Sequence, residues 1–133
     1  MGAWGHGVFE NDDAMDWVTD LLESSDLAAV TAALAAVVEA EVGEEIDAGD
    51  GAAALAAAEV VAALAGQPLG DLPDNVGRWI RRRRAGVNEC LLDYALRAVR
   101  KVRAQSELKN LWQESAQYKD WLTVLADLKQ RLS

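Results

Sequence analysis

Basic residues are missing from the first part of this sequence. Residues 1–72 hold 15 of the 22 acidic residues and no lysine or arginine, whereas residues 73–133 hold the other 7 acids and all 13 bases. The two parts therefore carry −15 and +6, which gives the net charge of −9. In a single domain, this division predicts that an acidic half docks beside a basic half. We expect salt bridges from the acids to Arg78–Arg84 or to the bases at 97–103.

Cysteine, histidine and proline are also scarce. The single cysteine, Cys90, excludes an internal disulfide, so folding does not depend on an oxidising compartment. It lies beside Leu91 and Leu92, and we expect it to be a buried, small apolar side chain. His6 is the only histidine, which excludes a metal site built from several histidines of one chain. Two prolines among 133 residues, with long alanine and leucine runs, favour helices.

Long hydrophobic segments are absent as well. The longest apolar run covers residues 27–38 and is interrupted by Thr31, whereas crossing a bilayer takes about 20 residues. The N-terminus shows neither the basic region nor the continuous apolar stretch of a signal peptide. An apolar content of 51% predicts a globular protein rather than a disordered one. We therefore expect a cytoplasmic protein that does not contact the membrane.

The spacing of apolar residues predicts an all-α fold, a compact single-domain bundle of six or seven helices. The expected helices cover about residues 12–24, 27–41, 51–65, 74–84, 87–104 and 117–132, with a short helix that begins after Ser106. No segment alternates like a half-buried strand. Within the domain, 1–133, we expect a glycine-rich arm (1–10), an acidic helical half (11–66), a hinge loop (67–73) and a basic helical half (74–133).

The glycine-rich arm, residues 1–10, carries its own apolar anchors. Trp4 and Phe9 are large aromatic side chains, and each can bury about 150–250 Å². We expect both to be buried, because an ordered arm rich in glycine needs such an anchor. Asn11 then has the side chain of a helix N-cap and predicts that the first helix begins directly after it.

The opening segment also follows a specific pattern, Met-Gly-x-Trp-Gly-x-Gly-x-Phe, with Asn-Asp and Asp-Trp after it. The pattern is carried here by Met1, Gly2, Trp4, Gly5, Gly7, Phe9, Asn11, Asp12, Asp16 and Trp17. It resembles the start of a bacterial family, domain-of-unknown-function family 4259. The runs Ala56–Glu59 and Ser106–Trp112 also look like features of that family. The resemblance implies no activity, and His6 occupies a variable position of the pattern.

Three carboxylates, Asp12, Asp16 and Asp20, stack along one edge of the expected first helix, with Asp13 at the border. They are a solvated face that matches the helix dipole and is open to pairing with the basic half, or else a metal or two-carboxylate site that includes His6. Residues four apart are about 6 Å apart along a helix, too far for all three carboxylates to hold one cation. We expect no tight metal binding and no cofactor.

A run of arginines in the second half is the other candidate. Arg81–Arg84, with Arg78 and Trp79 nearby, resemble a basic patch that binds nucleic acid. Consecutive residues of a helix point in all directions, so no more than about half of these arginines can face one ligand. Pairing with the acidic half is the favoured interpretation, and it disfavours nucleic acid as a partner.

The sequence assigns no biochemical function, and we carry three hypotheses. The first is a non-enzymatic protein that binds a partner protein through its acidic face, by analogy with antitoxin or immunity proteins. The alternatives are a metal-dependent enzyme or metal-binding protein that uses the acidic cluster, and a nucleic-acid binder that uses the arginines. The candidate binding residues are Trp4, His6, Asp12, Asp13, Asp16, Asp20, Arg78, Arg81, Arg82, Arg83 and Arg84.

Overall fold

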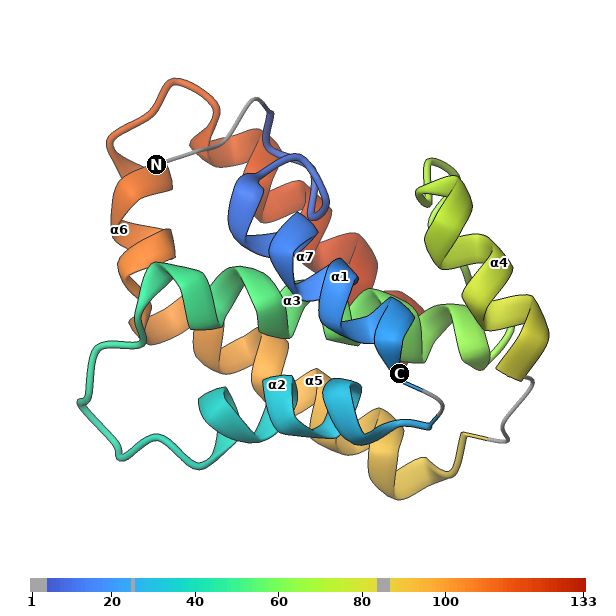
Figure 1. Cartoon of the computed structure of the whole chain (residues 1–133). Coiled ribbons are helices and arrows are strands. Elements are labelled where there is room, and N and C mark those ends of the chain that lie inside the picture. The colour runs from blue at the N-terminus through green and yellow to red at the C-terminus, as the bar shows by residue number, and fades with distance from the viewer. Residues whose placement is uncertain (1–4, 25, 84–86) are drawn as a thin grey trace.

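A computed structural model describes residues 5–24, 26–83 and 87–133, and seven helices lie within these ranges. In chain order they are α1 (Asp12–Glu23), α2 (Ala28–Val38), α3 (Ala48–Leu64), α4 (Asp74–Arg83), α5 (Glu89–Gln105), α6 (Glu107–Gln113) and α7 (Tyr118–Leu132) (Figure 1). The expected all-α bundle is confirmed, and the expected helices agree with the observed ones to within a few residues. None of the described helices has the length and apolar character needed to cross a bilayer.

Local capping explains where several helices begin and end. The side chain of Asn11 accepts a hydrogen bond from the N–H of Ala14 at 2.8 Å, and α1 begins directly after it, as expected. Ser106 caps α6 in the same way, by accepting from Lys109 N–H at 2.9 Å. After α3 the chain turns at Gly66, whose φ of 90° lies in the left-handed region that favours glycine.

Helix α3 occupies the centre of the bundle and packs against every other described helix (Figure 1). Alanine is its commonest residue and most of its side chains are buried, so neighbouring helix axes can approach closely. The expected hairpin of α2 and α3 is confirmed, because the two helices run antiparallel and pack side by side. The first-half helices α2 and α3 also pack on α5, so both halves contribute to the central packing.

The loop between α2 and α3 is fastened to the junction of α5 and α6. The N–H of Ile46 donates to Gln105 O at 2.9 Å, and the N–H of Glu107 donates to Ile46 O at 2.7 Å. These bonds form an isolated parallel bridge between Ile46 and Ser106. The ammonium group of Lys101 donates to the backbone carbonyls at the end of α2. A single bridge leaves no alternating pattern in the sequence, so sequence reasoning could not find it.

The aromatic anchors lie where the sequence predicts them. Phe9 is buried, and so are the four tryptophans of the helices, Trp17, Trp79, Trp112 and Trp121. Trp4 lies outside the described residues, so its burial stays a prediction. The expectation for Cys90 is wrong, because its side chain is exposed. Cys90 lies in the first turn of α5, whereas the buried stretch of that helix begins only at Ala95.

Candidate functional site

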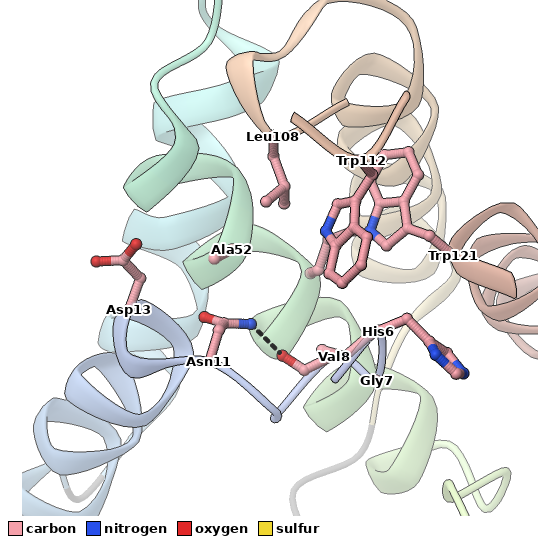
Figure 2. A pocket seen from close by; sticks show the side chains of 10 residues that line it. His6, Gly7, Val8, Asn11, Asp13, Ala52, Leu108, Trp112 and Trp121 are labelled. Atoms are coloured by element: carbon pink, nitrogen blue, oxygen red, sulfur yellow. Dashed lines mark hydrogen bonds between the residues drawn. The ribbon is translucent and has the colours of Figure 1, made fainter. Parts of the chain in front are cut away.

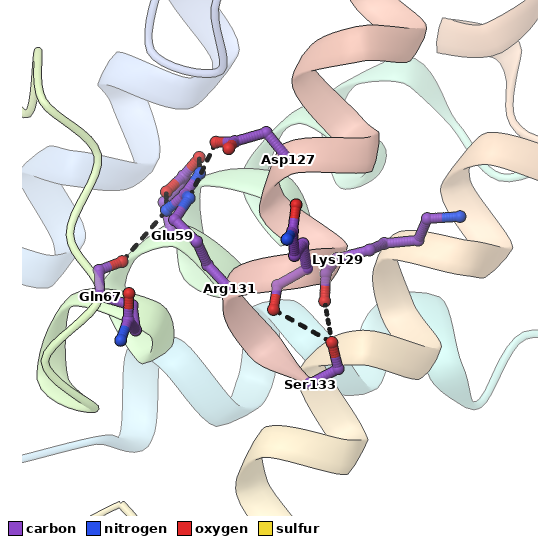
Figure 3. A network of polar contacts seen from close by, with 7 residues as sticks. Glu59, Gln67, Asp127, Lys129, Arg131 and Ser133 are labelled. Carbon is purple, nitrogen blue, oxygen red and sulfur yellow. Dashed lines mark hydrogen bonds and ion pairs between the residues drawn. The ribbon is translucent and has the colours of Figure 1, made fainter.

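Glu59, near the middle of α3, is the one fully buried charged side chain in the described ranges. Its two carboxylate oxygens accept hydrogen bonds from the guanidinium of Arg131 on α7, at 2.7 and 2.9 Å (Figure 3). Arg131 also donates to Asp127 at 2.8 Å and to the carbonyl of Gln67 at 3.2 Å. The hydrogen bond to Glu59 is the main cause that raises the pKa of Arg131. This network fastens α3 to α7 and leaves Glu59 fully paired.

The pair corrects the prediction about where the two halves meet. A salt bridge does join an acid of the first half to a base of the second, as expected, but the base is Arg131. Arg78, Arg81 and Arg82 are exposed and form no ion pair with the described residues. Charge separation in the sequence therefore did not identify the partner, because the pairing residue is set by how α7 packs on α3.

We call four of the exposed carboxylates of α1 the acidic stripe: Asp12, Asp13, Asp16 and Asp20. The buried side of α1, which includes Trp17 and Leu21, turns this stripe outward. Within the described structure no lysine or arginine pairs with any of the four. Both carboxylate oxygens of Glu59 thus have a cationic partner, whereas the acidic stripe has none among the described residues.

A second feature, which we call the arginine groove, lies between α1 and α4. It is a depression of about 340 Å³ lined by Leu22, Asn75, Arg78, Trp79 and Arg82. Arg78 and Arg82 are one helical turn apart and face the same groove. Leu22 adds an apolar side chain that is 41% exposed. The groove therefore offers two positive charges beside an apolar surface.

The basic residues do not form one continuous patch. Arg97 and Arg100 on α5 line a separate depression with Lys101. Helix α4 packs on α1 and α3 but not on α5, so these bases are apart from the arginine groove. Arg84 lies outside the described residues, and the side chain of Arg83 is not described either.

The arm contributes His6, which the structure does not bring to the acidic stripe. A cavity of about 10 Å³, enough for about one water molecule, lies between the arm and the indoles of Trp112 and Trp121. Figure 2 shows His6 and Asp13 on opposite sides of this cavity. Across the described residues, no three His, Cys, Asp or Glu side chains are grouped so that they could hold a metal ion.

The glycines of the arm have a packing role that sequence reasoning missed. The carboxylate of Glu10 folds back over Gly5 and Gly7, so a Cβ on either glycine would collide with it. Glu10 is an exposed, flexible side chain and can move aside, so the collision itself is cheap to relieve. In the sequence, the close spacing of Gly5, Gly7 and Glu10 is the signal that could have indicated this contact.

Comparison with protein families identifies this chain. It matches the family described as "Domain of unknown function (DUF4259)" over residues 2–124 and therefore belongs to that family. Searches of curated proteins and of solved structures gave no match.

Proposed function

We propose that this family member is a non-enzymatic protein-interaction protein whose acidic stripe binds a partner. The observation that carries the proposal is the exposure of Asp12, Asp13, Asp16 and Asp20 without a cationic partner in the described structure. Like charges four residues apart destabilise a helix by about 0.2–0.5 kcal/mol per pair. A stripe whose neighbouring carboxylates repel one another, and which forms no ion pair with the described residues, is consistent with a surface kept for binding.

The stripe determines what kind of partner fits. A row of carboxylates one helical turn apart is complementary to a protein surface that presents lysine or arginine at a similar spacing. By analogy, a basic toxin neutralised by an antitoxin-like or immunity-like protein would be such a partner. The proposal assumes a cytoplasmic setting, which rests on the lone cysteine in the sequence.

Affinity capture with charge-reversed variants tests this proposal. The full chain and the variant Asp16→Lys, Asp20→Lys are each used to capture proteins from the source cell at one salt concentration. The matched control is Glu89→Lys, Asp93→Lys, because these two exposed acids of α5 have the same four-residue spacing. We expect a captured protein that the control retains and the stripe variant loses. Capture that is equal for all three proteins, or no capture at all, contradicts the proposal.

Nucleic acid binding through the arginine groove is a second candidate. The observation that favours it is the exposure of Arg78, Arg81 and Arg82, none of which forms an ion pair with the described residues. A gel shift with a single-stranded oligonucleotide tests it, since such binding weakens steeply with salt. The net charge of −9 opposes this function by repelling the phosphate backbone.

A further inference from the structure

Two charged features of opposite sign, neither of which forms an ion pair with the described residues, belong to neighbouring helices. Helices α1 and α4 contact each other and both pack on α3 (Figure 1). Leu22 of α1 lines the arginine groove together with Arg78 and Arg82 of α4. Both features therefore involve α1, the acidic stripe on its exposed face and the arginine groove along its contact with α4, and among the described residues no ion pair joins them.

We propose that the arginine groove binds a second copy of this chain, with the acidic stripe of each copy in the groove of the other. This inference rests on the proposed function and names the partner of the acidic stripe. In a dimer with a twofold axis, every contact between the two copies occurs twice. If the acidic stripe of the first copy lies in the arginine groove of the second, the stripe of the second copy also lies in the groove of the first. Two equivalent sets of ion pairs then form in one dimer.

The spacing of the charges supports this pairing. Arg78 and Arg82 are separated by four residues, and so are Asp16 and Asp20. Both rows therefore repeat once per helical turn, about 6 Å, so two carboxylates can face two guanidiniums at once. Arginine suits such contacts, because its planar group can bond both oxygens of a carboxylate.

An apolar contact accompanies the charges. Leu22 is 41% exposed although it is large and hydrophobic, and it lies in the groove between the two helices. A second copy seated in the groove covers this side chain and removes its surface from water. The net charge of −9 on each copy opposes association at long range. At physiological salt, charges more than about 8 Å apart are largely screened, so the contacts in the groove decide the outcome.

Sedimentation equilibrium of the full chain, over a wide range of concentration at physiological salt, tests the proposal. We expect a dimer that dissociates on dilution. Two double variants reverse the charges. One combines Arg78→Glu with Arg82→Glu in the groove, and the other combines Asp16→Arg with Asp20→Arg in the stripe. Each of them replaces attraction by repulsion in both contacts of the dimer. Each should weaken dimerisation by about tenfold or more. The control Arg97→Glu, Arg100→Glu changes two exposed bases of α5 outside the groove and should dimerise like the unmodified chain.

The decisive arm of the experiment is to mix the double variant of the groove with the double variant of the stripe. Each variant supplies the charge that the other has reversed, so an equimolar mixture should form a mixed dimer as strong as the original one. This rescue also shows that both variants fold.

A monomeric unmodified chain, or variants that no mixture rescues, would overturn the proposal. If the unmodified chain is monomeric but still captures a basic protein through Asp16 and Asp20, self-pairing is wrong and the proposed function stands. If the unmodified chain is monomeric and binds an oligonucleotide, and the double variant Arg78→Glu, Arg82→Glu loses this binding, the groove binds nucleic acid and the dimer proposal is wrong.

Discussion

The carboxylate of Glu59 and the guanidinium of Arg131 form two parallel hydrogen bonds, 2.7 and 2.9 Å long, across 72 residues of sequence. Glu59 is fully buried, whereas the Arg131 side chain is 13% exposed. Breaking a buried pair leaves an uncompensated charge, and this costs more than the pair itself contributes. The pair therefore makes the packing of α7 on α3 depend on both residues.

Arg131→Met should destabilise the chain strongly. The substitution keeps an apolar stem of similar length but leaves Glu59 buried without its partner, which costs about 3–5 kcal/mol. Urea unfolding measures the change. The control is Lys129→Met on the same helix, which forms no ion pair with the described residues and should stay within about 0.5 kcal/mol. Equal effects of the two variants would show that the pair does not hold α7.

The effect of Arg131→Met should not depend on arginine ionisation near neutral pH. The hydrogen bond to Glu59 raises the pKa of Arg131, and burial lowers it by less. A raised pKa in the folded state gives stability that is fully present at lower pH and is lost only as pH rises through that pKa. For an arginine this happens only in strong base. In unfolding experiments from neutral to mildly alkaline pH, the unmodified chain should therefore keep the stability that this pair contributes, and a steep loss of that stability within the range contradicts the assignment.

Phe9→Ala tests whether the arm is a structural part of the bundle. Phe9 is buried although it precedes the first helix. Truncation of a core phenylalanine costs about 3–5 kcal/mol, and thermal unfolding should show this loss. Val42, which is 97% exposed, provides the control Val42→Ala with little expected change. If the Phe9 variant melts like the control, the arm does not help to hold the fold.

Ser106→Ala tests the junction of α5 and α6. The buried hydroxyl donates to Val102 O at 2.6 Å and accepts from Lys109 N–H at 2.9 Å, so it ends one helix and caps the next. Loss of such a cap costs about 0.5–2 kcal/mol. Chemical denaturation should detect this, with the C-terminal Ser133→Ala, at an exposed position, as the reference. If Ser106→Ala and Ser133→Ala are equally stable, the Ser106 side chain does not stabilise the junction as a cap.

The acidic stripe should bind no metal ion tightly. Its carboxylates repeat once per turn, about 6 Å apart, and a cation needs ligands at about 2.0–2.6 Å. Figure 2 shows that His6 and Asp13 lie across a cavity from each other rather than converging. Isothermal titration with Mg²⁺, Ca²⁺, Mn²⁺ and Zn²⁺ should show no stoichiometric micromolar site. Such a site, lost in Asp16→Asn, would favour a metal-binding function instead.

The sequence predicted the helices well because their signals are local. Asn11 and Ser106 are capping side chains that mark a helix start without any tertiary context. Gly66 marks the end of α3 for the same reason. The burial of Phe9 followed from the cost of exposing a large aromatic side chain beside glycines.

The candidate site was less predictable because it depends on how helices pack. Glu59 lies in an alanine run that marks a buried helix, but nothing nearby in sequence indicates that Arg131 is its partner. The arginine groove combines Leu22 with Arg78 and Arg82. That arrangement follows from α4 packing on α1, which no periodicity in either segment reveals.

The central claim is that Glu59 holds the fold whereas the charge of the acidic stripe is free for a partner. Thermal melting of Glu59→Gln beside Asp16→Asn, Asp20→Asn tests it most directly. The first change weakens hydrogen bonds to a charged group, worth about 1.5–3 kcal/mol, and should lower the melting temperature by about 5–9 °C. The second removes repulsion between neighbouring carboxylates and should leave the melting temperature unchanged or slightly higher. A marked loss of stability in the double variant, equal to that of Glu59→Gln, would show that the stripe serves the fold and would contradict the claim.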